Sequence, residues 1–398
     1  MKEKNPFSTA AFMMLLMVTI FILPLNRGMA EEKGKPLVIG QSITFHSKVL
    51  NEDRQLWIHL PSSYDNSSTG YPVLYLLDGD QHFFYVSGYI KFFSSRDNMP
   101  EMIVVAIPNT DRTRDLLPVK MDRFPTSGGG DNFLKFLKEE LFPYVEENYR
   151  TEPYRILAGH SMAGMFTVYT LFTAPGMFNA YIAASPALHL GDRIVFKKAE
   201  SFFREQTAIK RFFFYTVGGL ESESMIANAR ELERLLKEKA PAGLDWHFQF
   251  LEKDEHGTIS HRSFCNGLET LYSGFLFPEA DPSVQSLEGI KKYYNRLSEK
   301  YGYPVTIPLM ILSIVGYDLV LQGKLDEAVK VLSFNAEKYP HVPNVYNLLG
   351  LAYEKGQQFE LAKKNFEVAC NMAEKDKSPL LKNFKRNLDR LLKTFGKK

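Results

Sequence analysis

The sequence predicts an α/β protein, in which a doubly wound, mostly parallel sheet precedes an all-helical part. Five apolar runs show no alternation of polar and apolar residues, which is typical of strands that helices cover on both faces. Between these runs lie stretches with the 3.6-residue period of amphipathic helices. The apolar runs are residues 73–77, 103–107, 155–158, 181–184 and 212–217, and the clearest helical stretches are residues 132–149, 162–172 and 225–239.

The two ends of the predicted sheet have patterns of their own. Residues 43–49 and 54–60 alternate between polar and apolar side chains, so we expect an antiparallel pair that opens the sheet. Residues 246–250 are expected to form its last strand. After residue 282 the strand patterns stop, and residues 284–398 are helical in period throughout.

The length and the charge balance limit the range of functions. A chain of 398 residues is too long for one core of the commonest size, so we expect two folded domains. The 48 Lys and Arg residues nearly balance the 46 Asp and Glu residues, which gives a net charge of +2. Because no basic stripe accompanies this balance, nucleic acid is not expected as a partner.

The amino-terminal segment has the features of an export signal. Lys2 and Lys4 precede an apolar run over residues 10–25, which is short for a membrane span, and small residues follow up to Ala30. We therefore expect cleavage after Ala30, no stable membrane span afterwards, and a mature protein in the periplasm or outside the cell. The alternative is an uncleaved anchor, because Arg27 lies between the apolar run and the proposed cleavage site.

The helical part contains an internal repeat. A shift of 34 residues brings Gly316 onto Gly350 and Ala328 onto Ala362, and Pro340 closes the first unit. This pattern resembles tetratricopeptide repeats, in which small residues let the two helices of a unit approach each other. Such repeats form concave faces that bind peptides, so the resemblance implies a protein partner. The units would serve equally well as a stabilising appendage.

One serine lies where a buried strand is expected to turn into a helix. Ser161 follows the apolar run that ends at Ala158 and precedes a helical stretch. This is the context of a nucleophile elbow, a tight turn that exposes the serine hydroxyl. Ala163 takes the place where a second glycine is usual, and Gly164 follows it. Since alanine is also small, Ser161 is the predicted nucleophile; the alternative is a serine that only caps the helix.

Five segments together carry a resemblance to a known family. They are Tyr71-Pro-Val-Leu-Tyr-Leu-Leu-Asp-Gly79, Gly159-His-Ser-Met-Ala-Gly164, Ala184-Ser-Pro186, Val217-Gly-Gly-Leu-Glu221 and His256-Gly-Thr258. In this order, residues 45–277 resemble the esterase D-like family of α/β-hydrolases. That family includes siderophore esterases, feruloyl and acetyl-xylan esterases, S-formylglutathione hydrolases and mycolyltransferases. The resemblance implies a serine hydrolase domain.

The general base and the acid that orients it are expected after two late strands. His256 follows the last predicted strand at the family's position, which places it ahead of its neighbour His261. Glu221 follows the run that ends at Val217 and is the preferred acid. Glu223 is the alternative acid. Either glutamate could instead simply begin the following helix, where carboxylates are favoured.

The resemblance also implies an oxyanion hole built from two backbone amides. One belongs to Met162, the residue after the nucleophile, and the other to Asp80. Gly79 is expected to let the loop before Asp80 approach the substrate closely. His189 is a weaker candidate for the pocket wall.

A charged loop after the run at residues 103–107 has two interpretations. Arg112 and Arg114 lie at the side of the sheet where ligands bind, and Arg114 is a weak candidate for contacting an acidic substrate group. Alternatively, these arginines pair with Asp115 and brace the loop, which is the interpretation that we favour.

The predicted function is hydrolysis of a carboxylic ester through an acyl-enzyme, with a small-molecule or glycan ester as substrate and no metal or organic cofactor. An acyltransferase would use the same residues, and an inactive binding scaffold is the alternative from another class.

Cys265 and Cys370 are expected to be buried thiols, and a disulfide between them is the other possibility. The predicted organisation is a signal peptide at residues 1–30, an α/β-hydrolase domain at residues 31–282 and a tetratricopeptide-like domain at residues 283–398.

Overall fold

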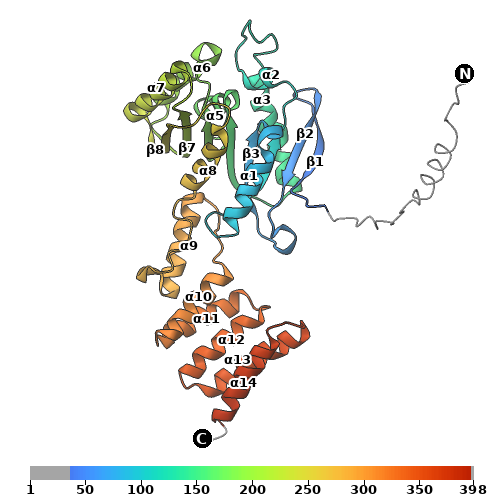
Figure 1. Cartoon of the computed structure of the whole chain (residues 1–398), viewed down its shortest axis with the longest axis vertical. Helices are drawn as coiled ribbons and strands as arrows, with labels where there is room; N and C mark the ends of the chain where they lie inside the picture. Colours follow the sequence, from blue (N-terminus) through green and yellow to red (C-terminus); the bar gives the residue numbers. More distant parts are fainter. Residues whose placement is uncertain (1–35, 396–398) are drawn as a thin grey trace, which may run out of the picture. The chain divides into compact units, whose positions relative to one another are not determined.

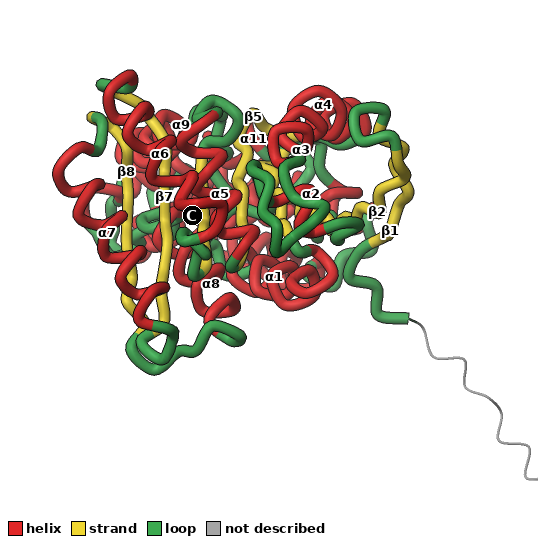
Figure 2. The backbone as a smooth tube through the Cα atoms, turned by 90° about the horizontal axis from the view of Figure 1, so that it is seen from above, coloured by secondary structure: helices red, strands yellow, loops and turns green. Residues whose placement is uncertain are grey.

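Eight strands form one sheet: β1 (Gln41–Ser47), β2 (Glu52–His59), β3 (Tyr71–Leu77), β4 (Ile103–Ile107), β5 (Thr151–His160), β6 (Ala180–Ala184), β7 (Ala208–Gly218) and β8 (Ala242–Leu251). The computed structural model describes residues 36–395. The strand order is β1-β2-β4-β3-β5-β6-β7-β8. Figure 2 shows β1 and β2 at one side of the sheet and β7 and β8 at the other. β1–β2 and β2–β4 are antiparallel, and the remaining neighbours are parallel. The predicted α/β-hydrolase fold, including its antiparallel opening pair, is confirmed.

Helices cover both faces of the sheet, which explains the unbroken apolar runs. All seven residues of β3 are buried. Val73 and Tyr75 pack into the core on one face, whereas Leu74 and Leu76 pack into the core on the other. The helices of this part are α1 (Gly79–Ser94), α2 (Arg112–Leu116), α3 (Gly130–Phe136), α4 (Phe142–Asn148), α5 (Met162–Thr173), α6 (Leu190–Glu205), α7 (Glu223–Lys239) and α8 (Ile259–Leu271).

The helix expected over residues 132–149 is interrupted in the structure. α3 ends at Phe136, a π-helical turn covers Leu137–Leu141, and α4 begins at Phe142. Pro143 is the second residue of α4 and has no backbone N–H to donate. A proline inside a helix removes one hydrogen bond and crowds the preceding turn, so the wider π turn relieves this conflict.

The carboxyl-terminal part is entirely helical, as predicted (Figure 1, yellow to red). Gly316 lies against Leu332 and Gly350 lies against Phe366, so close that an added Cβ would come within 2.5 and 2.7 Å of these side chains. The glycines therefore let the helices of each pair approach each other closely. The helices are α9 (Leu287–Tyr301), α10 (Leu309–Leu321), α11 (Leu325–Lys338), α12 (Pro343–Lys355), α13 (Phe359–Lys375) and α14 (Leu381–Phe395).

A continuous core joins the sheet to these helices across the boundary predicted at residue 282. The core on the α1 and α8 face of the sheet extends into α9–α12. Aromatic rings carry much of this contact: the ring of Tyr154 on β5 lies 5.7 Å from that of Tyr301 and 5.9 Å from that of Tyr303. Tyr272, just after α8, lies 5.2 Å from Tyr301.

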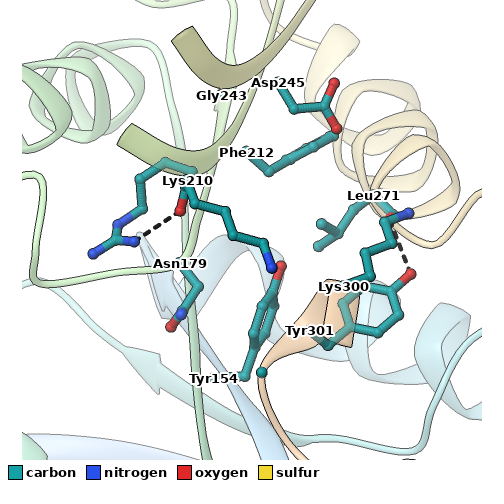
Figure 3. Close-up of a pocket in the computed structure, with 11 residues that line it drawn as sticks. Tyr154, Asn179, Lys210, Phe212, Gly243, Asp245, Leu271, Lys300 and Tyr301 are labelled. Atoms are coloured by element: carbon teal, nitrogen blue, oxygen red, sulfur yellow. Dashed lines mark hydrogen bonds between the residues drawn. The ribbon is translucent and has the colours of Figure 1, made fainter. Parts of the chain in front are cut away.

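A pocket lies beside this contact, near the amino-terminal ends of the central strands (Figure 3). Lys210 and Lys300 line it, and their ammonium groups donate to backbone carbonyls of Glu299 at 2.6 Å and Leu271 at 3.1 Å. These carbonyls belong to the last turns of α9 and α8, where cations are stabilising. The lysines therefore have structural roles, and the pocket lies away from the carboxyl-terminal strand ends that carry the predicted site.

Three other predictions concern the termini and the cysteines. The predicted signal peptide lies outside the described residues. Within residues 36–395, no helix is both long enough and apolar enough to cross a membrane. Cys265 and Cys370 are free thiols, and of the two only Cys370 is fully buried.

Candidate active site

Ser161 occupies a strained turn between β5 and α5. Its backbone has φ 58° and ψ −114°, a region that a residue with a Cβ rarely adopts and that costs about 1–3 kcal/mol. Two hydrogen bonds hold the turn from both sides. The N–H of Ser161 donates to the carbonyl of Ala184 at 2.9 Å, and the N–H of Ala187 donates to the carbonyl of Ser161 at 3.0 Å. The end of β6 therefore fixes the serine.

Small residues around Ser161 allow this close approach. A Cβ on Gly159 would lie 2.5 Å from the carbonyl oxygen of Ala163. A Cβ on Gly164 would lie 2.9 Å from the carbonyl oxygen of Ala184. Ala163 itself is fully buried and fits. The position that the usual motif gives to a second glycine thus tolerates alanine, whereas the next position packs against the end of β6.

Three side chains form a continuous hydrogen-bonded chain. Nε2 of His256 lies 2.8 Å from Oγ of Ser161, and Nδ1 of His256 lies 2.7 Å from Oε2 of Glu221. Because an ionised carboxylate only accepts, Nδ1 carries the proton, and Nε2 of the neutral ring is free to accept from the serine hydroxyl. The hydroxyl of Ser161 is thus directed at His256 instead of capping α5.

The side chain of Glu221 is buried, with an exposure of 1%, and its donors favour the ionised form. Burial alone raises the pKa of a carboxyl group, but donors around Glu221 outweigh it and lower the pKa. The donors are the His256 ring, the hydroxyl of Ser185 at 2.6 and 2.7 Å, and the N–H of Gly218 at 2.8 Å. The carboxylate therefore stays charged beside the imidazole.

Two glycines bring the loop that carries Glu221 against the loop that carries His256. A Cβ on Gly218 would lie 2.2 Å from the carbonyl oxygen of Asp254, and a Cβ on Gly219 would lie 2.4 Å from that of Glu252. The N–H of Leu220 donates to the same Asp254 carbonyl at 3.1 Å. Only residues without a side chain allow the two loops to lie this close.

The two rival residues lie elsewhere. Glu223 is the first residue of α7, where a carboxylate is favoured by the helix terminus. His261 is exposed on α8, and its ring contacts the carbonyl of Thr258 at the start of the same helix. The structure therefore brings Glu221 and His256, and neither rival, to Ser161.

The two amides expected at the oxyanion hole both belong to first turns of helices. Met162 is the first residue of α5, and Asp80 is the second residue of α1. First-turn N–H groups have no partner within their helix, and the helix terminus favours negative charge. The turn before Asp80 is held by Asp78, which has φ 51° and receives two hydrogen bonds from Arg112 at 2.7 and 2.8 Å.

Gly79 packs closely against the backbone of β4. A Cβ at this position would lie 2.7 Å from the backbone nitrogen of Ile107 and 2.9 Å from the carbonyl carbon of Ala106. Close packing of the loop against β4 therefore requires the glycine, and contact with a substrate is not needed to explain it.

Arg114 braces its loop, which is the interpretation that we favoured from the sequence. Its guanidinium donates to both carboxylate oxygens of Glu52 at 2.6 and 2.8 Å, and to Asp115 at 2.7 Å. Asp115 also accepts from the buried Arg54 at 2.5 Å. These contacts correct the weaker expectation for Arg114, because its donors already have carboxylate partners.

His189 lies at the beginning of α6 and is exposed. Desolvation of the ring, together with the nearby Arg123 and His256, lowers the pKa of His189.

Two further residues contact the site, and neither of them was assigned a role in the sequence analysis. Ser185 lies in the Ala184-Ser-Pro186 segment and contacts Glu221. His160 precedes Ser161, and its Nε2–H donates to the backbone carbonyl of His256 at 2.9 Å. Both residues belong to segments that carry the family resemblance, so the sequence marked their positions but did not reveal which groups their side chains contact.

Within the described chain, no cluster of three or more His, Cys, Asp or Glu side chains is placed to bind a metal ion.

Comparisons with known proteins identify the family of this chain. A family model described as "Putative esterase" matches residues 47–239. The chain is 30% identical over 238 residues to the ferri-bacillibactin esterase BesA of Bacillus subtilis, covering 53% of this chain and 81% of BesA. It is 32% identical over 167 residues to a siderophore enterobactin esterase of Emericella nidulans, covering 35% of this chain and 54% of that protein.

Two solved structures extend the likeness. An IroE-like serine hydrolase from Shewanella oneidensis superposes with a TM-score of 0.67 at 25% identity, covering 75% of this chain and 99% of that one. An uncharacterised protein from Capnocytophaga ochracea has a TM-score of 0.67 at 17% identity, covering 88% of this chain and 99% of its own, which shows a shared fold. Because 88% of this chain is covered, the match to the Capnocytophaga ochracea protein extends beyond the part that contains the sheet. The chain belongs to the "Putative esterase" family of α/β-hydrolases and is a carboxylic ester hydrolase.

Proposed function

We propose that the enzyme cleaves its ester through an acyl-enzyme intermediate, with Ser161 as nucleophile, His256 as general base and Glu221 as the orienting acid. The hydrogen-bonded chain from Ser161 through His256 to Glu221 carries this proposal. A serine hydroxyl attacks efficiently only when a base removes its proton, and a base works best when a third group fixes its orientation.

The proposed reaction has two halves. Oγ of Ser161 bonds to the carbonyl carbon of the ester while Nε2 of His256 takes the hydroxyl proton. The tetrahedral intermediate then expels the alcohol, which receives that proton from His256. In the second half, water gives a proton to His256 and attacks the acyl group, and the acid leaves as Ser161 recovers its proton. Glu221 remains ionised and stabilises the imidazolium in both halves.

The amides of Met162 and Asp80 are proposed to stabilise the negative oxygen of each tetrahedral intermediate. Their positions in the first turns of α5 and α1 support this role, because these N–H groups are free of intrahelical partners. Losing one such donor in other enzymes lowers kcat by about 10²- to 10³-fold.

For the substrate we propose a small-molecule ester of the siderophore type. The names of BesA and of the Emericella nidulans enzyme support this choice. A glycan acyl ester is the alternative. Parallel assays with a siderophore lactone and an acetylated or feruloylated oligosaccharide distinguish them by the ratio of kcat/KM values.

The experiment that tests the proposed route is active-site labelling followed by hydrolysis. Purified protein and the Ser161→Ala variant are treated with a fluorophosphonate probe and assayed on p-nitrophenyl esters of increasing chain length. We expect labelling and hydrolysis in the parent and neither in the variant. Labelling of folded Ser161→Ala at the parent's rate would contradict the assignment. Transfer of the acyl group to an added alcohol in preference to water would instead identify an acyltransferase, and no turnover on any ester would favour a binding scaffold.

Export and the role of the helical part remain proposals as well. The proposal of export rests on the sequence of the first 30 residues. It would be supported if the protein, expressed in a bacterium, had the intact mass of a chain that begins at Glu31. The core shared by the sheet and α9–α12 favours helices that stabilise the hydrolase, although a protein partner on the repeat units stays a prediction.

A further inference from the structure

Ser185, the first residue after β6, contacts the acid and the base at once. Its hydroxyl donates to Oε1 and Oε2 of Glu221 at 2.7 and 2.6 Å, and its Oγ lies 3.2 Å from Nδ1 of His256. We propose that Ser185 is a positioning residue of the active site, which fixes the Glu221 carboxylate so that His256 stays aligned with Ser161. This inference rests on the proposed acyl-enzyme route.

The hydroxyl of Ser185 can donate one hydrogen bond through its proton and accept others through its two lone pairs. It does both in the active site. The proton is shared between the two oxygens of Glu221, so the carboxylate cannot rotate without losing this bond. A lone pair faces Nδ1–H of His256, whose main acceptor is Oε2 of Glu221. Ser185 therefore closes a triangle with the acid and the base, and the N–H of Gly218 is the other donor that holds the carboxylate.

The backbone of Ser185 supports a functional role. Its φ of 38° is uncommon for a residue with a Cβ, and the residue is fully buried. The N–H of Ser185 donates to Oγ1 of Thr216, which in turn contacts Oγ of Ser263 on α8. Strained conformations persist where the surroundings over-determine them, and they gather at functional sites.

The position of Ser185 also links it to the nucleophile. Ala184, the residue before it, accepts the N–H of Ser161, and Ala187, two residues after it, donates to the carbonyl of Ser161. The two ends of the segment from Ala184 to Ala187 thus hold the backbone of Ser161. The hydroxyl of Ser185, in the same segment, holds Glu221. Any movement of this segment would displace Ser161 and Glu221 together.

Removing the hydroxyl should alter the pH dependence of the reaction. Without this donor the charge on Glu221 is less compensated, so the carboxylate binds protons more tightly and holds the imidazolium more strongly. Both effects move the acid limb of the kcat/KM profile to higher pH. The other titratable or charged groups around His256 are His160 at the end of β5, His189 at the start of α6, and the Asp254–Arg262 pair formed between its own loop and α8.

The test compares Ser185→Ala and Ser185→Gly with the parent, using the whole protein. Glycine removes the hydroxyl and also relieves the backbone strain, so this variant is expected to fold even where alanine does not. We expect kcat to fall by about 10- to 100-fold in both variants, as for the loss of a hydrogen bond to a charged group, with KM changed by less than about threefold. The acid limb should move upward by about half a pH unit to one unit.

Ser87→Ala is the matched control. Ser87 is fully buried on α1, and its hydroxyl has no hydrogen-bond partner among the described residues. This variant should keep the parent's kcat and acid limb. An unmoved acid limb in folded Ser185→Gly, or a fall in kcat that only follows a lower melting temperature, would overturn the positioning role. Retained activity in Ser161→Ala would instead reject the acyl-enzyme route itself, so the two failures are distinguishable.

Discussion

Nε2 of His160, the residue before the nucleophile, lies 2.9 Å from the backbone carbonyl oxygen of His256. A carbonyl can only accept, so the neutral His160 ring carries its proton on Nε2. Burial, with the neighbouring rings of His256 and His82, lowers the pKa of His160 from its ordinary value of 6.5 to about 4. His160 is therefore a neutral donor at physiological pH, and it ties the end of β5 to the loop that carries the base.

This relationship predicts a specific loss of stability in acid. Between pH 6.5 and about pH 4 the unfolded chain binds a proton at residue 160 that the folded chain does not, so the free energy of unfolding falls as the pH is lowered through this window. The loss is on the order of 3 kcal/mol. His160→Gln retains an N–H donor but does not titrate, so its free energy of unfolding should fall less steeply.

Urea unfolding at several pH values checks this prediction, with His261→Gln as the control because His261 is exposed. The control should show the same pH slope as the parent. If His160→Gln also shows the parent's slope, the acid sensitivity arises elsewhere.

Glu221 and Glu223 provide a matched pair for identifying the acid. Glu221→Gln keeps the size of the side chain but removes the charge that fixes and stabilises the imidazole, so we expect kcat to fall by about 10³- to 10⁴-fold. Glu223→Gln removes a carboxylate at the start of α7 and should leave kcat within about twofold. Steady-state kinetics on one ester decides between them, and a larger loss in Glu223→Gln would reverse the assignment.

The sequence was sufficient for some parts of this site and insufficient for others, for a physical reason. The sharp turn at Ser161 was predictable because its strand, turn and helix are contiguous in the chain. Glu221 was less certain, because its contact with His256 depends on how Gly218 and Gly219 pack against a loop about 35 residues away. The role of Ser185 was not predictable, because it arises from contacts 36 and 71 residues distant.

The fold shows the same distinction between local and distant causes. Buried strands were found where apolar runs predict them, but β5 begins at Thr151, four residues before its apolar run. The first residues of β5 are at least partly exposed, so they do not belong to an apolar run in the sequence. The beginning of α6 was not among the clearest helical signals. Its residues Gly191, Asp192 and Arg193 have left-handed backbone angles, which interrupt the helical period. Tertiary contacts set such boundaries.

The glycines beside the nucleophile predict an unequal tolerance to substitution. Gly159→Ala would place a Cβ 2.5 Å from the carbonyl oxygen of Ala163, so the turn must shift, at a cost of about 1–3 kcal/mol and with a fall in kcat as Ser161 moves. Ala163→Gly restores the usual motif and should cost only the helix penalty of about 0.5–1 kcal/mol, with kcat within a few-fold of the parent. Melting temperatures and kcat of both variants check this prediction. A strong gain in kcat from Ala163→Gly would mean that alanine impairs the elbow.

The last prediction concerns whether the helical part and the hydrolase part unfold together. Tyr301 at the end of α9 is 2% exposed, packs against Tyr154 and Tyr272, and donates its hydroxyl to the carbonyl of Leu271 at 3.2 Å. Tyr301→Ala should lower the free energy of unfolding by about 3–5 kcal/mol, because it opens a cavity in the shared core. Tyr317→Ala, at a residue of α10 that is 42% exposed, should cost much less.

Following two signals during the same thermal scan tests the coupling. β5 carries Tyr154 in its middle and ends next to Ser161. The loss of the Tyr301 ring, which packs against Tyr154, should therefore destabilise the strand that leads to Ser161. Esterase activity and far-UV circular dichroism should therefore be lost at one temperature in the parent and at one lower temperature in Tyr301→Ala. Activity that keeps the parent's midpoint while part of the helical signal melts early would show that the helices form an independent domain. In that case the boundary predicted at residue 282 would also be a boundary of folding.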